Sequence, residues 1–391
     1  VIALSYGYMI RKFPVSGGEF IYAKEAIGKR NAFVCGWGMI LAYWSLIPLN
    51  ATALALISRY LFPGIVQQGL LYQIAGWDVY AGEVILASAF IIIMAIVNIR
   101  GIKQAAWLQT AIALTLVGCI LVVTFLVMGS ADWANLDPGF PDGRRWWKGV
   151  FSIVAMAPWA FIGFDCIPQS AEEYNFSHKK STGIMITAIL MAALLYVAIC
   201  IVTAAGLKPW QELLAERNNW PTGYVVRNTL GLAGLITLGT AMFCAVVSGM
   251  NAFYISTSRL MYAMAQEGSL PAWFGVISPK YGTPKHAILF TMAASLFAPW
   301  FGREILIWIV DMTSVGAAIV FAYTTASAAI IAKRNGDKGQ VWLGIVGCIF
   351  SLFFLSLLII PGMPGYLSFQ SRVVLLAWIG IGLLFYLKIR K

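Results

Sequence analysis

The stretch GVFSIVAMAPWAFIGFDCIPQS, residues 149–170, decides the fold. It is long and apolar enough to cross a bilayer, for which a helix needs about 20 apolar residues. Pro158 and Pro168 each remove a helix hydrogen bond, and Gly163 tolerates non-helical dihedral angles. The stretch is therefore predicted to be a membrane helix that is interrupted near its middle.

An interrupted helix survives at membrane depth only where its backbone is buried in protein or lines a polar cavity. The freed backbone groups and the ends of the half-helices can then hold a small zwitterion. Asp165 lies in the same stretch, and an ionisable residue inside a membrane helix indicates a functional site in which the acid has a hydrogen-bonding partner. The alternatives are a proline kink without a ligand and a purely structural acid.

The rest of the chain has the composition of a membrane protein. Of its 391 residues, 60% are hydrophobic and 11% are charged, whereas about a quarter of a soluble domain is charged. Besides an opening apolar fragment at 1–10, we predict ten spans: 31–57, 82–99, 107–128, 149–170, 181–205, 231–258, 286–302, 306–331, 341–360 and 372–387. The predicted fold class is therefore an all-α membrane protein with about 11 transmembrane segments, the first partial. Continuous apolar runs disfavour a β-barrel.

The net charge of +11 could indicate a nucleic-acid partner. However, the basic residues form short clusters between the apolar runs, as the positive-inside rule describes. If the fragment 1–10 runs inward, 18 of the 27 basic residues lie on one side, among them Lys103, Arg390 and Lys391. We therefore expect a multi-pass protein of the cell membrane, with a cytoplasmic C-terminus, the lipid bilayer as a partner and no nucleic acid.

The sequence shows no catalytic triad, phosphate-binding loop or cluster of metal-ligating residues. The six cysteines lie inside apolar runs without C-x-x-C spacing, so neither a disulfide framework nor a zinc site is supported. We therefore predict no enzymatic activity, no cofactor and no metal.

Four motifs in fixed order carry a family resemblance: PVSGGEFIYA (14–23), NIRGIK (98–103), WAFIGFD (159–165) and SRLMYAMA (258–265). Across nearly the whole chain they resemble the amino acid–polyamine–organocation (APC) superfamily of transporters. The resemblance implies a LeuT-like bundle with two inverted five-helix repeats. Residues 1–128 would be an incomplete first repeat, 149–331 the second, and 341–391 two C-terminal helices. A glycine-broken first helix, which contributes to the site in relatives, would precede residue 1.

The resemblance also implies a site for a small amino acid or amine. The residues then expected to bind substrate are Trp159, Ala160, Phe161, Ile162, Gly163, Asp165 and Phe253. The expected gating residues are Tyr43, Trp159, Asp165 and Tyr323. The backbone carbonyls at 159–162 would receive the substrate ammonium, the Trp159 ring would close over the ligand, and tyrosine hydroxyls would bond Asp165. Ordinary packing is the alternative role for Tyr43 and Tyr323.

The sequence does not decide which ion or exchanged substrate drives transport. Some relatives carry a Lys in place of a coupling sodium ion, but the nearest position here is Leu116. Proton coupling elsewhere, exchange of one substrate for another, and sodium coupling at Ser256 and Thr257 all remain. The predicted function is secondary active transport of amino acids by alternating access. The alternatives are an amine carrier, for ethanolamine or a polyamine, and a non-transporting receptor or partner subunit.

Overall fold

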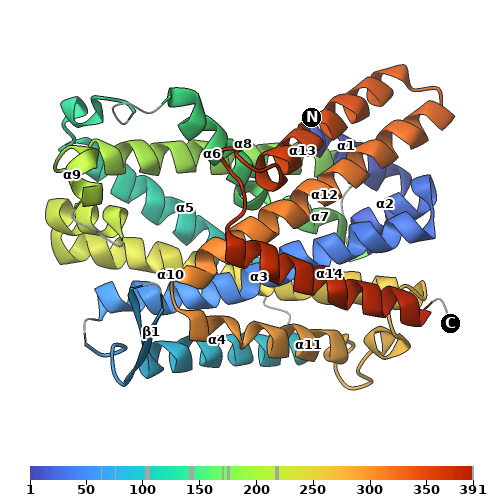
Figure 1. Cartoon of the computed structure of the whole chain (residues 1–391), viewed down its shortest axis with the longest axis horizontal. Coiled ribbons are helices and arrows are strands. Elements are labelled where there is room, and N and C mark those ends of the chain that lie inside the picture. Colours follow the sequence, from blue (N-terminus) through green and yellow to red (C-terminus); the bar gives the residue numbers. More distant parts are fainter. Residues whose placement is uncertain are drawn as a thin grey trace.

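The computed structural model describes residues 1–62, 64–74, 76–101, 106–140, 145–169, 171–173, 177–215 and 220–389. Lys103, Arg390 and Lys391, which the sequence places on the cytoplasmic side, lie outside these ranges. Within them the chain is a helical bundle with one short hairpin (Figure 1). The predicted all-α membrane class is confirmed.

Nine helical spans in the described ranges are long and apolar enough to cross a bilayer. They are α3 (Lys29–Leu61), α4 (Ala81–Ile99), α5 (Ala106–Met128), α6 with α7 (Trp146–Phe161 and Cys166–Gln169), α8 (His178–Ala204), α10 (Pro221–Gln266), α12 (Glu304–Arg334), α13 (Lys338–Ile359) and α14 (Phe369–Ile389). The shorter elements are α1 (Ile2–Lys12), α2 (Gly18–Ile27), β1 (Leu70–Ile74), β2 (Trp77–Tyr80), η1 (Trp133–Leu136), η2 (Ala171–Glu173), α9 (Trp210–Ala215), η3 (Ala272–Gly275), α11 (Lys285–Ser295) and η4 (Ala298–Phe301).

Nine of the ten predicted spans therefore correspond to membrane-length helices. The tenth prediction, 286–302, is wrong as a single continuous helix. Here α11 ends at Ser295, and a separate 3-10 turn, η4, contains Pro299. Proline cannot donate the hydrogen bond that would continue an α-helix, so the segment divides into two short pieces.

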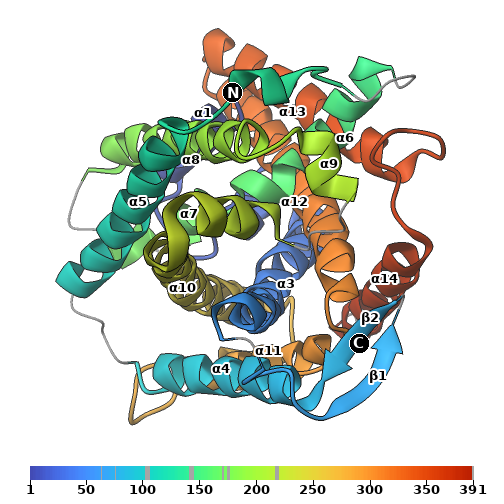
Figure 2. The same cartoon turned by 90° about the vertical axis from the view of Figure 1, so that its left-hand side faces the viewer.

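The spans differ greatly in how much protein surrounds them. In the most apolar part of each helix, 72% of α3 and 56% of α12 are buried, compared with 6% of α8. A helix that is apolar all round but scarcely buried is suited to lipid contact. Figure 2 shows α3 and α10 inside the bundle, with α4 and α11 on one side and α5 and α8 on another. The core is thus built around α3.

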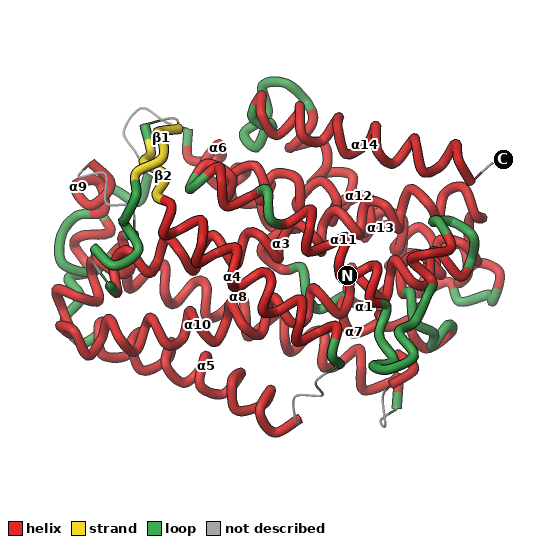
Figure 3. Tube along the Cα trace, turned by 90° about the horizontal axis from the view of Figure 1, so that it is seen from below, coloured by secondary structure: helices red, strands yellow, loops and turns green. Residues whose placement is uncertain are grey.

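Most long helices run in roughly the same direction (Figures 1 and 3). The β1–β2 hairpin lies at one end, which we call the hairpin end. The opposite end contains α2 and the C-terminus, and we call it the α2 end. The long helix α10 bends at Gly231, whose φ of 66° and ψ of −156° are not helical, so the predicted span 231–258 begins at this bend.

Candidate substrate site at the break between α6 and α7

The predicted interruption is present. Helix α6 ends at Phe161, Ile162 is extended with φ −61° and ψ 140°, and α7 begins only at Cys166. Gly163, between the two helices, has a φ of 127°, a conformation that residues with a Cβ rarely adopt. The break therefore depends on the glycine that the sequence analysis identified.

Side chains and backbone groups at the break stabilise it. The Gly163 amide donates a hydrogen bond of 2.7 Å to Asp165 Oδ1, and the Cys166 amide donates to the Gly163 carbonyl at 3.1 Å. From α8, the Tyr196 hydroxyl donates to the Ala160 carbonyl at 3.0 Å. Buried backbone groups need such partners, so these bonds stabilise the non-helical turn. Asp165 consequently has a structural task in addition to any role in transport.

The aromatic residues predicted for the site lie on α3, α6 and α10. Phe161 packs edge-on against Tyr196, with ring centroids 5.9 Å apart. Phe253, on α10, is buried and lies against Tyr43 of α3, also at 5.9 Å. Trp159 is partly buried and packs on the main core. A ring on each of α3, α6 and α10 thus belongs to the same interior region.

The expected bonds from tyrosine to Asp165 are not formed in this conformation. The Tyr43 hydroxyl is buried without a hydrogen-bond partner, although its ring is close enough to Asp165 for electrostatic interaction. Tyr323 instead donates to Asn31 Oδ1 at 3.3 Å. Asp165 obtains its partner locally, from the Gly163 amide. The gating role of the three residues stays a prediction.

The two candidate residues for an ion site, Ser256 and Thr257, are neighbours on α10. They are 2% and 0% exposed, and the Thr257 hydroxyl has no hydrogen-bond partner. Helix α10 packs against α7, so these hydroxyls lie on a helix adjoining the break. Among the described residues no group of three or more His, Cys, Asp or Glu could hold a metal.

Sequence analysis missed Glu19, the second residue of α2. Its side chain is 0% exposed, and its Oε2 accepts a hydrogen bond of 2.5 Å from Gln169 Nε2 at the end of α7. Glu19 is part of the motif 14–23, between two glycines and an apolar run. The feature of the sequence that indicated burial of Glu19 was its position directly before Phe20, Ile21 and Tyr22.

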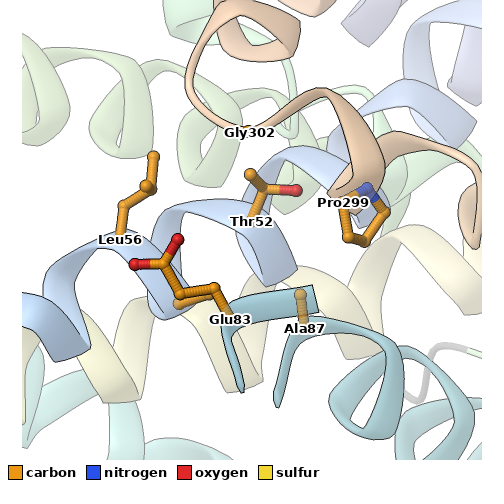
Figure 4. Close-up of a pocket in the computed structure, with 7 residues that line it drawn as sticks. Thr52, Leu56, Glu83, Ala87, Pro299 and Gly302 are labelled. Carbon is orange, nitrogen blue, oxygen red and sulfur yellow. The ribbon is translucent and has the colours of Figure 1, made fainter. Parts of the chain in front are cut away.

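A second buried acid, Glu83 of α4, was also missed. Arg59 of α3 forms an ion pair with it through both carboxylate oxygens, the contact to Oε2 being 2.6 Å. A small pocket adjoins this pair, and Figure 4 shows the Glu83 carboxylate reaching up to α3 beside Leu56. Because Arg59 pairs with both carboxylate oxygens of Glu83, neither oxygen is left unpaired for a charged ligand in the pocket. The pair lies at the hairpin end, away from the predicted site.

Comparison with known proteins decides the family. The sequence model of a family described as amino acid permease matches residues 1–384. The chain belongs to the amino acid permease family. The resemblance to the APC superfamily is thereby confirmed, and the chain is a membrane transporter rather than an enzyme at the level of the family. The inverted repeats and a preceding helix stay predictions.

This permease is similar to several characterised transporters. It is 27% identical to the methylthioribose transporter of Bacillus subtilis, over 85% of this chain and 70% of the relative. It is 26% identical to the branched-chain amino acid permease BcaP of the same organism, over 98% and 81% of the two chains. It is also 26% identical to the low-affinity putrescine importer PlaP of Escherichia coli, over 98% of this chain and 81% of the relative. These three relatives are named for methylthioribose, branched-chain amino acids and putrescine.

Proposed function

We propose that this permease moves amino acids across the cell membrane by alternating access, and that the substrate ammonium group binds at the break between α6 and α7. The observation that carries the proposal is the interruption at Ile162–Asp165 inside an otherwise apolar span. A break at this depth needs polar surroundings, and a bound small molecule supplies them during part of the cycle.

The end of α6 suits a positively charged group. The last carbonyls of a helix have no partner within it, and the helix dipole places about half a negative elementary charge there. Ala160 and Phe161 are in this last turn, and Trp159 precedes them. The Ala160 and Trp159 carbonyls each accept one hydrogen bond, from the Tyr196 hydroxyl and the Ile162 amide, and each has a second lone pair. We assign the ammonium to these carbonyls and the closing of the site to the Trp159 ring. Phe253 and Tyr43, which pack on each other, would form an apolar wall for the substrate side chain.

Alternating access follows from the same geometry. Gly163 provides a point where the two half-helices can change their angle without strain in a side chain. One half would then move with its neighbours while the other stays, so that the site opens to each side in turn. In this proposal the C-terminus is cytoplasmic, and the α2 end faces the cytoplasm.

An amine carrier is the second candidate function. Its support is the relative PlaP, which is similar over 98% of this chain, together with two buried acids near the break, Glu19 and Asp165. Carboxylates could pair with the second ammonium group of a diamine. An amino acid would instead need hydrogen-bond donors for its own carboxylate.

Counterflow in liposomes separates these candidates. Vesicles containing the reconstituted chain are loaded with unlabelled leucine, and entry of labelled leucine is measured with leucine, ornithine, isoamylamine or putrescine as competitors. We expect saturable counterflow that amino acids inhibit and the amines, at equal concentration, do not. Absence of leucine counterflow, together with counterflow of labelled putrescine in vesicles loaded with putrescine, would establish the amine carrier. Binding without any flux would instead indicate a receptor or partner subunit.

A further inference from the structure

Two buried carboxyl groups, one on α2 and one in the break, lie near each other. Glu19 and Asp165 are both 0% exposed, and they are close enough to interact electrostatically. Gln169 links their elements, because it donates to Glu19 and lies on α7, which directly follows Asp165. Helix α2 packs against α7 (Figure 1). The two acids therefore belong to one cluster.

The cluster is not saturated with hydrogen bonds. Glu19 Oε1, Asp165 Oδ2 and Gln169 Oε1 are buried and have no hydrogen-bond partner. The Tyr6 hydroxyl lies close to the Glu19 carboxyl and the Tyr43 hydroxyl close to Cys166, and both tyrosines interact electrostatically with the two acids. Unpaired buried polar atoms are costly. The three unpaired oxygens are acceptors, so the cluster has room for one more hydrogen-bond donor.

Among the residues that the structure describes, no cation forms an ion pair with either acid. The titratable groups that act on Glu19 or Asp165 from the surrounding elements are Tyr6 of α1, Cys35 and Tyr43 of α3, and Cys166 of α7. None of these carries a positive charge in any protonation state.

Two carboxylates cannot both stay ionised in such a place. Burial removes the hydration that stabilises a carboxylate, and a second negative charge nearby adds repulsion. Helix α2 lies outside the nine spans, and burial raises the pKa of its Glu19 carboxyl well above the usual value, with the Asp165 carboxyl raising it further. A proton shared by the two acids would relieve both the burial cost and the repulsion.

We propose that Glu19 and Asp165 form a proton-binding site that couples this permease to the proton gradient. The inference rests on the transport function proposed above. The closed pair shares one proton. When the α2 end opens, an O–H bond of the carboxylic acid breaks, the proton passes to water, and a carboxylate remains. Before the α2 end can close again, the pair has to bind a new proton or a cationic group of the substrate.

A surface hydrogen bond joins the two segments that carry the cluster. Ser16 is three residues from Glu19, and its hydroxyl donates to Glu172 Oε2 at 3.0 Å. This bond links the segment before α2 to η2, which follows α7. In the proposal, separating Ser16 from Glu172 lets the two segments part, and water then reaches the acids.

The test compares Glu19→Gln with Glu25→Gln, an exposed acid on the same helix. Vesicles with an outside pH one unit below the inside pH are given labelled substrate. For one proton per cycle, wild type and Glu25→Gln should accumulate substrate about tenfold, the ratio of the proton concentrations. Glu19→Gln should show no accumulation, while counterflow at equal pH on both sides persists.

The outcomes separate the two proposals. Absence of counterflow in wild type would reject the transport function itself. Counterflow together with gradient-driven accumulation in Glu19→Gln would overturn only the proton site, as would accumulation that follows a sodium gradient instead of pH. If Glu19→Gln does not fold, the infrared spectrum of wild type decides. A protonated-carboxyl stretching band at neutral pH supports the proposal, and its absence overturns it.

Discussion

Two buried glutamates, Glu83 at the hairpin end and Glu19 at the α2 end, have opposite surroundings. Arg59 occupies both oxygens of Glu83, also donates to the Asp78 carbonyl at 2.7 Å, and lies over the Trp77 ring at 4.5 Å. Glu19 accepts from the Gln169 amide, lies close to the Tyr6 hydroxyl and has no described cation as a partner. The first acid is thus paired with a cation in the structure. The second is not, and we propose that it gains and loses a proton during transport.

The largest effect expected from this difference concerns stability. Glu83→Gln leaves the Arg59 charge without its partner, and breaking a buried pair costs about 3–5 kcal/mol. We expect roughly 2–4 kcal/mol here, because the Arg59 side chain is still 12% exposed and water screens it. The same change in Glu19 should alter the unfolding free energy by less than about 1 kcal/mol. Thermal unfolding in detergent measures both, and equal shifts would remove the distinction.

Asp165→Asn should separate transport from folding. The asparagine oxygen can still accept the bond from the Gly163 amide, so the break should persist. The carboxylate charge at the proposed substrate site is lost, and we expect counterflow to fall roughly 10- to 100-fold, corresponding to the 1.5–3 kcal/mol of a charged hydrogen bond. Counterflow and size-exclusion profiles are measured together. A variant that is misfolded, instead of intact and slow, would contradict this expectation.

Trp159→Ala tests the lid assigned to the break. Removing the ring should weaken substrate binding about tenfold, or ~1.4 kcal/mol, and should leave the proton cluster unchanged. Binding is measured by scintillation proximity with labelled substrate, and Phe301→Ala, a residue at the hairpin end, is the control. Unchanged affinity together with an unchanged exchange rate would reject the lid.

The smallest effect is expected from Gly18→Ala. Gly18 has a φ of 39°, and a Cβ there would lie 2.9 Å from Gln169 Nε2, so the alanine should push Gln169 away from Glu19. The backbone strain costs about 1 kcal/mol. Gly28→Ala is the matched control, because Gly28 also has a positive φ, 100°, but no heavy atom within 4 Å.

The two glycine variants differ in their expected pH response. Gly18→Ala should shift the pH dependence of uptake, since Glu19 loses its donor. Gly28→Ala should lower stability by a similar amount without such a shift. Identical pH profiles in the two variants would show that Gln169 does not position Glu19.

The sequence predicted the local features of this molecule well. Gly163 acts through its own backbone, so the interruption of the helix after Phe161 could be predicted and is confirmed, whereas Pro158, which was also expected to interrupt the helix, lies inside α6. The apolar runs likewise predicted the spans, except where Pro299 divides one into two short pieces. Such features depend on residues a few positions apart in the chain, so a local sequence pattern predicts them directly.

The partners of the buried acids could not be predicted in the same way. Arg59 and Glu83 are on different helices, and only their packing brings them together. Glu19 and Gln169 are 150 residues apart. For Asp165 we expected tyrosines from distant helices, whereas the actual donor is the amide two residues before it. The functional roles of the site residues stay predictions.

Substrate protection of a native cysteine tests most directly whether the break holds the substrate. Cys166 is the first residue of α7 and is partly exposed, whereas Cys200 is exposed on α8. Alkylation of both in the same wild-type preparation can be followed by peptide mass spectrometry. Saturating substrate should slow the alkylation of Cys166 and leave that of Cys200 unchanged. A measurable alkylation rate at Cys166 that substrate leaves unchanged, in protein that performs counterflow, would contradict a substrate site at the break.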